Sequence, residues 1–176
     1  MRANFTAPVA AALIAAFISN VVFAHSASDA YLTLETQQRT AGRGIVIRGQ
    51  WDIALRDLHG AVRLDDDGDG NITWGELRKK QSAIARYAYP NLQARGDGKP
   101  CTINPTRQAV TDHADGSYVA LFFDLVCAGA PQRLTLDYRL FFNIDPSHRG
   151  ILLLRSGNTT STALVSPENA KIEWVP

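Results

Sequence analysis

The sequence predicts a mainly β protein, an antiparallel β-sandwich that carries one helix–loop–helix insertion. Two observations lead to this fold class. Apolar and polar residues alternate before about residue 53 and again after residue 90, with turn-forming residues between the alternating stretches, a pattern typical of short strands in packed sheets. Between them, at about residues 53–89, apolar residues recur three and four positions apart, which is the spacing of a helix that packs on one face.

Two strands are expected before the insertion, at residues 30–36 and 44–52. Their alternation predicts that one face of each strand is buried. After the insertion the alternation returns, and turn residues such as Asp115-Gly116 and Asp145-Pro146 separate the segments, as expected of chain reversals. The remaining expected strands are residues 91–95, 101–104, 108–113, 117–127, 133–143, 150–155, 161–166 and 171–175.

The insertion is expected to contain two helices. In the first, at residues 53–64, helical spacing relates Leu55, Leu58 and Val62. The second is expected at about residues 73–88 and ends before Pro90, because proline lacks the N–H that would continue a helix. Its apolar residues near one face are Leu77, Ile84 and Ala88.

The segment between the expected helices carries acidic residues at regular intervals. Asp65, Asp67 and Asp69 alternate along it, Gly70 follows them, and Glu76 stands at the twelfth position. With an apolar residue at the eighth position, this pattern matches the EF-hand loop, in which oxygen atoms surround Ca²⁺. The expected metal ligands are Asp65, Asp67, Asp69, the Asn71 backbone carbonyl, Thr73 through its hydroxyl or a water, and Glu76 through both oxygens.

An acidic surface turn is the alternative interpretation, because Asp-Gly-Asp-Gly also favours tight turns. A turn alone requires neither Glu76 nor the apolar Ile72, and converging carboxylates repel one another when no cation is bound. No second stretch fits the loop pattern, since residues 112–123 have Ala114 at the third position and Phe123 at the twelfth. We therefore expect a single EF-hand, whose Ile72 packs against the β domain or across a dimer.

The first 24 residues have the pattern of a secretory signal peptide. Arg2 precedes a mostly apolar run at residues 8–22, and Val22-Phe23-Ala24 places small or apolar residues before a cleavage site after Ala24, as such signals require. A membrane anchor is the alternative, but the run is short for a span of about 20 residues. We expect residues 25–176 to form one exported β domain with the EF-hand inserted at about residues 53–89.

The composition excludes several classes of protein. A chain of 176 residues with 45% hydrophobic residues is typical of a single globular domain. Loss of residues 1–24 would remove Arg2 and no acidic residue, which leaves equal numbers of basic and acidic residues. A net charge near zero does not favour nucleic-acid binding. No segment after residue 24 is long and apolar enough for a transmembrane helix, so we expect none in the mature chain.

Cys101 and Cys127 are the only two cysteines of the chain, and each lies at the edge of an expected strand. An exported chain meets oxidising conditions, which favours a disulfide between them. The alternative is a thiolate metal site, but no second cysteine pair lies at ligand spacing, as such sites usually require.

Several strings of residues are distinctive. They are HSASDAYLTL at residues 25–34, GQWDIALRDL at 49–58, ITWGEL at 72–77, DYRLFF at 137–142 and DPSHRG at 145–150. In these strings the chain resembles the exported N-terminal region of some members of the HupE/UreJ family of hydrogenase- and urease-accessory membrane proteins. The resemblance implies a bacterial periplasmic location and leaves open a membrane protein as partner. Those relatives continue into membrane helices implicated in nickel or cobalt handling, which no residue here matches.

Three functional hypotheses follow. The first is a calcium-binding module without catalysis, in which calcium is structural because exported compartments keep even a weak site filled. The second is an accessory module for nickel, cobalt or copper, in which His25 at the processed N-terminus acts with His59, His113 or His148. The third is an enzyme, which we do not expect, because nucleophile, phosphate-loop and HExxH motifs are all missing from the sequence.

Overall fold

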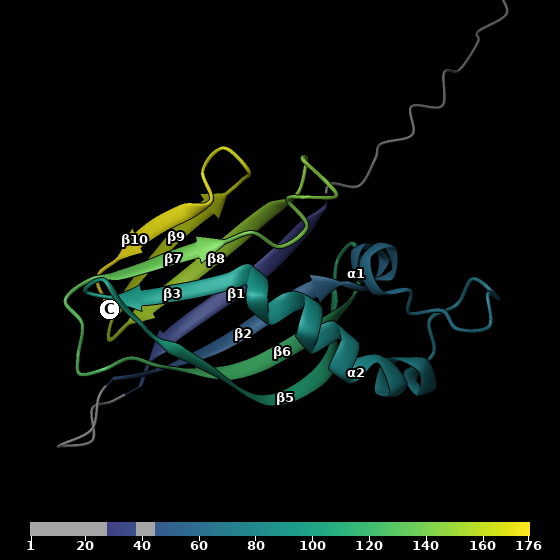
Figure 1. The fold of residues 1–176 in the computed structure, drawn as a ribbon, viewed down its shortest axis with the longest axis horizontal. Helices are drawn as coiled ribbons and strands as arrows, with labels where there is room; N and C mark the ends of the chain where they lie inside the picture. Colours follow the sequence, from purple (N-terminus) through teal and green to yellow (C-terminus); the bar gives the residue numbers. More distant parts are fainter. Residues whose placement is uncertain (1–27, 38–44) are drawn as a thin grey trace, which may run out of the picture.

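The computed structural model describes residues 28–37 and 45–176, which fold into two β-sheets and two α-helices (Figure 1). The expected signal peptide at residues 1–24 and His25 lie outside the described residues. In chain order the elements are β1 Asp29–Thr36, β2 Val46–Ala54, α1 Leu55–Val62, α2 Trp74–Ala88, the 3₁₀ turn η1 Tyr89–Asn91, β3 Leu92–Gly96, β4 Lys99–Pro100, β5 Thr102–His113, β6 Gly116–Val126, β7 Leu134–Tyr138, β8 Arg149–Ser156, β9 Thr159–Val165 and β10 Lys171–Trp174.

The two sheets share one hydrophobic core. The larger sheet has the strand order β5-β6-β2-β1-β8-β9, and the smaller sheet has the order β10-β7-β3-β4. Figure 1 shows the smaller sheet in front of the larger one, with α2 extending this front layer across β6 and β5. The rings of Trp51 and Tyr138, from opposite sheets, meet edge to face with centroids 5.4 Å apart. Both side chains are fully buried, so the space between the sheets is a packed core.

The expectation of a mainly β chain is confirmed, but the expectation of purely antiparallel pairing is wrong at one position. Strands β1 and β8 run parallel, with Asp29 opposite Arg149 and Leu34 opposite Leu154. After β7 the chain leaves the smaller sheet and crosses over residues 139–148. The chain therefore begins β8 at the end of the larger sheet where β1 also begins. Because the two strands start at the same end, they run parallel.

Several expected boundaries differ, and the three largest differences have local reasons. Residues 53 and 54 were expected in the first helix but extend β2, where Ile53 pairs with Val119 of β6. The expected strands 101–104 and 108–113 form a single strand, β5, whose register shifts between Pro105 and Arg107. An edge strand tolerates proline at such an irregularity, because the missing N–H faces solvent. The expected strand 133–143 ends at Tyr138 and is followed by turns in which Phe141 has a φ of 58°.

The predicted disulfide is confirmed between Cys101 and Cys127, which fastens the start of β5 to the end of β6. Thr102 and Val126, the residues next to the two cysteines, lie opposite each other in the sheet. The disulfide therefore links the two strands covalently just beyond their last paired residues. In the described ranges, no helix combines the length and the apolar character that crossing a bilayer demands.

Candidate metal centre

The acidic segment at residues 65–76 runs from the end of α1 into the first turn of α2, and two apolar residues attach it to the core. Leu64, directly before it, is fully buried. Ile72 within it packs against the hydrophobic core, which is one of the two arrangements expected for this side chain. Leu64 belongs to the core that the sheets share and Ile72 packs against it, so these two residues attach the segment to the β domain, while residues 66–71 between them are exposed.

Three of the predicted ligands come together. One carboxylate oxygen each of Asp65, Asp67 and Glu76 lies within 4.8 Å of the other two. Glu76 is buried, with 6% of its surface exposed, while Asp67 is exposed and Asp65 is half-buried. Oxygens at this separation can reach one cation at the 2.3–2.6 Å contacts that are typical of Ca²⁺.

Backbone N–H groups hold these carboxylates in place. Asp65 accepts hydrogen bonds from the N–H groups of Gly68 at 2.7 Å and Gly70 at 3.0 Å. Gly70 has a φ of 84°, a conformation that glycine adopts without steric cost. Glu76 accepts from the N–H of Asp66 at 2.7 Å and from the N–H of Thr73 at 2.8 Å. The loop therefore folds back on its own acidic groups, and its backbone dipoles favour their charged form.

The electrostatics of the loop keep it anionic. The N–H and the hydroxyl of Thr73, with the N–H of Asp66, lower the pKa of Glu76 to about 2. The N–H of Gly70 likewise lowers the pKa of Asp65 below its ordinary value. Lys80 on α2 forms an ion pair with Asp66 at 2.6 Å, outside the group of three carboxylates. Asp65 and Glu76, two of the three converging groups, thus carry negative charge at neutral pH.

Among the other predicted ligands, Asp69 lies outside this group of carboxylates. Asp69 accepts a hydrogen bond from the N–H of Asn71 at 2.7 Å, and the Asn71 side chain turns to the carbonyl of Asp69. The Thr73 hydroxyl donates to Glu76 at 2.7 Å. Asp65, Asp67 and Glu76 are therefore the part of the predicted site that the structure assembles.

Thr73 and Glu76 also have a role that the ligand pattern did not predict. They form a capping box at the start of α2, in which the Thr73 side chain accepts from the N–H of Glu76 and the Glu76 side chain accepts from the N–H of Thr73. The signal was present in the sequence, since Thr73 and Glu76 stand three positions apart before an apolar run. The cap ties the position of the Glu76 carboxylate to the start of the helix.

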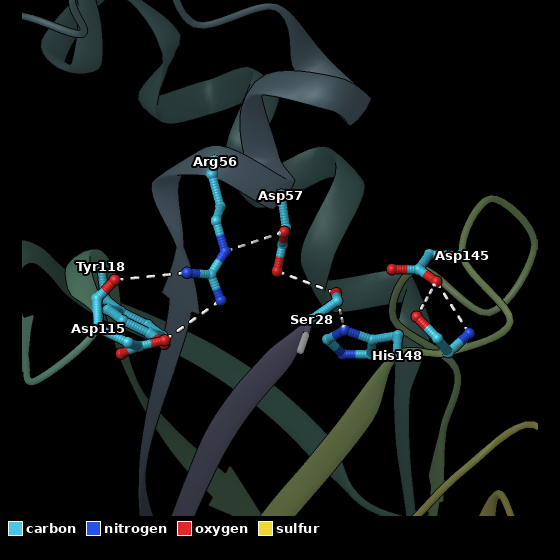
Figure 2. Close-up of polar contacts among 8 residues, drawn as sticks. Ser28, Arg56, Asp57, Asp115, Tyr118, Asp145 and His148 are labelled. Carbon is cyan, nitrogen blue, oxygen red and sulfur yellow. Dashed lines mark hydrogen bonds and ion pairs between the residues drawn. The ribbon is translucent and has the colours of Figure 1, made fainter. Parts of the chain in front are cut away.

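A second polar cluster lies between α1 and the starts of β1 and β8, and sequence analysis missed it. In Figure 2, Asp57 on α1, Ser28 before β1 and His148 before β8 form a chain of contacts. Ser28 Oγ donates to Asp57 at 3.0 Å and lies 2.7 Å from His148 Nδ1. The hydroxyl of Tyr138 lies 2.9 Å from His148 Nε2. Because the Ser28 hydroxyl proton is directed at Asp57, Ser28 Oγ is left to accept a hydrogen bond from Nδ1–H of His148. Nε2 then accepts from the Tyr138 hydroxyl, so the contacts fit a neutral imidazole with its proton on Nδ1.

Burial disfavours the charged forms of His148 and Asp57. His148 is fully buried, and burial lowers its pKa to about 4. Burial also raises the pKa of Asp57, although the Ser28 hydroxyl and the Arg56 guanidinium oppose the change. Arg56 extends the chain of contacts to Asp115 at 3.2 Å. The cluster joins α1 to strands of both sheets, so it positions the helix that leads into the acidic loop.

The remaining histidines do not gather into a metal site in the described part of the chain. His113 Nε2 lies 3.0 Å from Asp52 and its ring stacks on Tyr31. His59 Nδ1 faces the N–H of Asp65 at 3.4 Å, and His148 uses both ring nitrogens in contacts within the fold. Among residues 28–37 and 45–176, the sole group of three or more potential ligands is that of Asp65, Asp67 and Glu76.

Compared with models of known protein families and with curated protein sequences, the chain gives no match. The function is therefore argued from the geometry and chemistry of the acidic loop.

Proposed function

We propose that the protein is an exported calcium-binding protein with a single EF-hand and that calcium has a structural role. The observation that carries this proposal is the convergence of three carboxylates, from Asp65, Asp67 and Glu76, within 4.8 Å of one another. All three donors are hard oxygen atoms, which suit Ca²⁺ and do not select copper or nickel. In this proposal the antiparallel pairs of the two sheets form a β-sandwich, and the helix–loop–helix is its EF-hand.

The chemistry of the loop supports the proposal. Backbone N–H groups orient Asp65 and Glu76 before any ion binds, which reduces the ordering that binding requires. The low pKa of Glu76 means that no proton must leave this ligand at neutral pH. A bound Ca²⁺ would supply positive charge to carboxylates that otherwise repel one another. Asp69, the Asn71 carbonyl and Thr73 would complete the coordination, with Glu76 contributing both oxygens.

A structural role fits the anchoring of the loop. Ile72 and Leu77 both pack against the core that the sheets share, so an ion between α1 and α2 would hold both helices on the β domain. Sites of the extracellular type bind calcium at about 10⁻⁴–10⁻³ M. At a calcium concentration 100 times the dissociation constant, binding would add about 2.7 kcal/mol to the free energy of unfolding.

Calorimetric titration of the processed chain with calcium, magnesium and nickel tests the proposal. We expect binding of calcium at about one ion per chain, weaker binding of magnesium, and loss of the calcium signal in Glu76→Gln. Glutamine can retain the capping box with Thr73, so this variant removes charge and a bidentate ligand while it keeps the helix start. Glu168→Gln is the matched control, since Glu168 is an exposed glutamate in the turn before β10. Calcium binding by Glu76→Gln equal to that of the control would refute the proposal.

The alternative is a periplasmic accessory module for nickel, cobalt or copper, or a partner of a membrane permease. It draws on the resemblance to the HupE/UreJ family and on His25, which lies outside the described residues. The all-oxygen donor set favours calcium over this alternative. The nickel titration above discriminates the two, because a transition-metal module would bind nickel in Glu76→Gln as well as in the unaltered chain.

A further inference from the structure

The two sheets have four edge strands among the described residues: β5 and β9 in the larger sheet, and β4 and β10 in the smaller sheet. An edge strand presents N–H and C=O groups that have no partner in the sheet, and another chain can pair with them. Proteins usually prevent this pairing with short edges, charged side chains, proline or irregular register. A comparison of the four edges therefore shows which one is open to a partner.

Three of the edges carry such protection. Strand β4 has two residues, Lys99 and Pro100. Strand β10 has four residues and presents Lys171 and Glu173. Strand β5 is long, but its register is interrupted beside Pro105. Short length, charged side chains, proline or an interrupted register therefore disfavours the addition of a further strand at each of these three edges.

Strand β9, the outermost strand of the larger sheet in Figure 1, has none of these devices. Its seven residues read TTSTALV, without charge or proline, and its pairing with β8 is regular from Gly150–Val165 to Ser156–Thr159. β-branched residues form most of the strand, which favours an extended backbone. Leu164 is 58% exposed on it, so an apolar side chain accompanies the open edge.

The hairpin geometry fixes which backbone groups of β9 are open. The turn between β8 and β9 has two residues, Gly157 and Asn158, so the flanking pair Ser156 and Thr159 is hydrogen-bonded. Every second residue from Thr159 onward then bonds to β8. The N–H and C=O groups of the alternate residues Thr160, Thr162 and Leu164 point away from β8, toward the open edge.

We infer that β9 pairs antiparallel with β9 of a second copy of this chain, about a twofold axis at Thr162. In this register Thr162 faces its own symmetry mate, and Thr160 faces Leu164 of the other copy. Each outward N–H and C=O group finds a partner, and the two larger sheets join edge to edge. The interface is isologous, as is usual for homodimers.

The chemistry of the strand favours a copy of itself over a different partner. Like charges placed directly opposite each other across an antiparallel pair are destabilising, whereas threonine pairs are favourable. A strand without any charge meets its own copy without repulsion and offers no charge by which to select another protein. Leu164 lies opposite Ile151 of β8, which is half-buried. In the proposed register Thr160 of the second copy lies opposite Leu164, so Leu164 is flanked by Ile151 of its own copy and by Thr160 of the other.

Sedimentation analysis of the processed chain from about 1 μM to about 1 mM tests the inference. We expect a reversible dimer in the unaltered chain. Thr162→Lys places two ammonium groups opposite each other at the twofold axis, and we expect the dissociation constant to rise at least about tenfold. Thr162→Glu should act in the same way, and an equimolar mixture of the two variants should dimerise again because the opposed charges then attract. Thr106→Lys, an exposed threonine on the protected edge strand β5, is the matched control.

Three outcomes would overturn the inference. The first is an unaltered chain that stays monomeric up to about 1 mM. The second is a dimer that Thr162→Lys and Thr106→Lys weaken equally, since the contact would then lie elsewhere. The third is an equimolar mixture of the Thr162→Lys and Thr162→Glu variants that remains monomeric, because antiparallel pairing at this residue predicts mutual rescue. Circular dichroism of each variant shows that any change in mass occurs in the folded chain.

Discussion

The acidic loop and the polar cluster around His148 (Ser28, Asp57, Tyr138 and His148), here the His148 cluster, shift the pKa values of their groups in opposite senses. The loop stabilises charged groups, whereas burial in the cluster disfavours them, although α1 connects the two regions. In the loop, backbone N–H groups lower the pKa values of Asp65 and Glu76 and favour the charged carboxylates. In the cluster, burial lowers the pKa of His148 and raises that of Asp57, so burial disfavours the charged form of each group. A site that maintains converging negative charge suits the binding of a cation. A buried histidine whose two ring nitrogens contact residues of different elements suits the joining of structural elements.

The difference arises from the neighbours of each group. Each loop carboxylate accepts hydrogen bonds from the N–H groups of its own loop, which stabilise the anion at short range. His148 instead lies among the rings of Tyr138, Phe141 and Phe142, where little solvation is available to an imidazolium. If the loop binds calcium as proposed and the cluster contributes stability, separate changes in the two regions should have separate effects.

Replacement of His148 is expected to have the largest effect. His148→Ala leaves a cavity in the core and removes the partner of the buried Tyr138 hydroxyl. We expect a loss of about 3 kcal/mol or more in the free energy of unfolding. Urea unfolding measures this loss, and it should be equal with calcium and with EDTA. A loss found only in the presence of calcium would contradict the separation of the two regions.

Acid is expected to destabilise the chain through the same residue. The unfolded chain takes up a proton on histidine near pH 6.5, whereas folded His148 does so only near pH 4. Since the unfolded state binds more protons between these values, stability falls as the pH decreases from about 6.5 to about 4, by at most about 3 kcal/mol. Asp145 and Arg149, beside His148, act in opposite directions on this pKa.

The control for this pH dependence is His148→Gln, which has no titrating group at this position. Its unfolding free energy should be lower at pH 7, but it should change less between pH 6.5 and 4 than that of the unaltered chain. Glu76 acts in a lower window, because its contribution is present above pH 4.5 and is lost as the pH falls toward about 2. Equal slopes for both chains above pH 4.5 would show that His148 is not the titrating group.

Removal of calcium is expected to have an intermediate effect. With calcium at about 100 times its dissociation constant, EDTA should lower the free energy of unfolding by about 2.7 kcal/mol and lower the melting temperature accordingly. Calcium should restore the melting temperature more effectively than magnesium, which demands smaller and more regular coordination. Thermal unfolding with and without EDTA measures the effect, and identical curves would contradict a structural role for the ion.

The sequence predicted the acidic loop more successfully than the His148 cluster, and chain separation explains the difference. The converging carboxylates of Asp65, Asp67 and Glu76 lie within twelve residues of one another, so a local pattern specifies them. The contact between Ser28 and His148 joins residues 120 positions apart, and it depends on the parallel pairing of β1 with β8. Alternation predicts that a segment is a strand, but it does not identify its neighbour. For the same reason most strands were expected correctly while the crossover to β8 was not.

One pair of identical substitutions compares the two regions directly and is expected to have the smallest effects on stability. Asp57→Asn keeps an oxygen that can accept from Ser28, and since burial already disfavours the charge, we expect a change below about 1 kcal/mol. Its calcium affinity should equal that of the unaltered chain. Asp65→Asn should likewise change the unfolding free energy little in EDTA, because Asp65 lies in the loop and not in the shared core. It removes one of the three converging carboxylates, so calorimetry should show at least about tenfold weaker calcium binding. If Asp57→Asn weakened calcium binding as strongly as Asp65→Asn, the cluster would be part of the binding site, and the two regions would have to be treated as one.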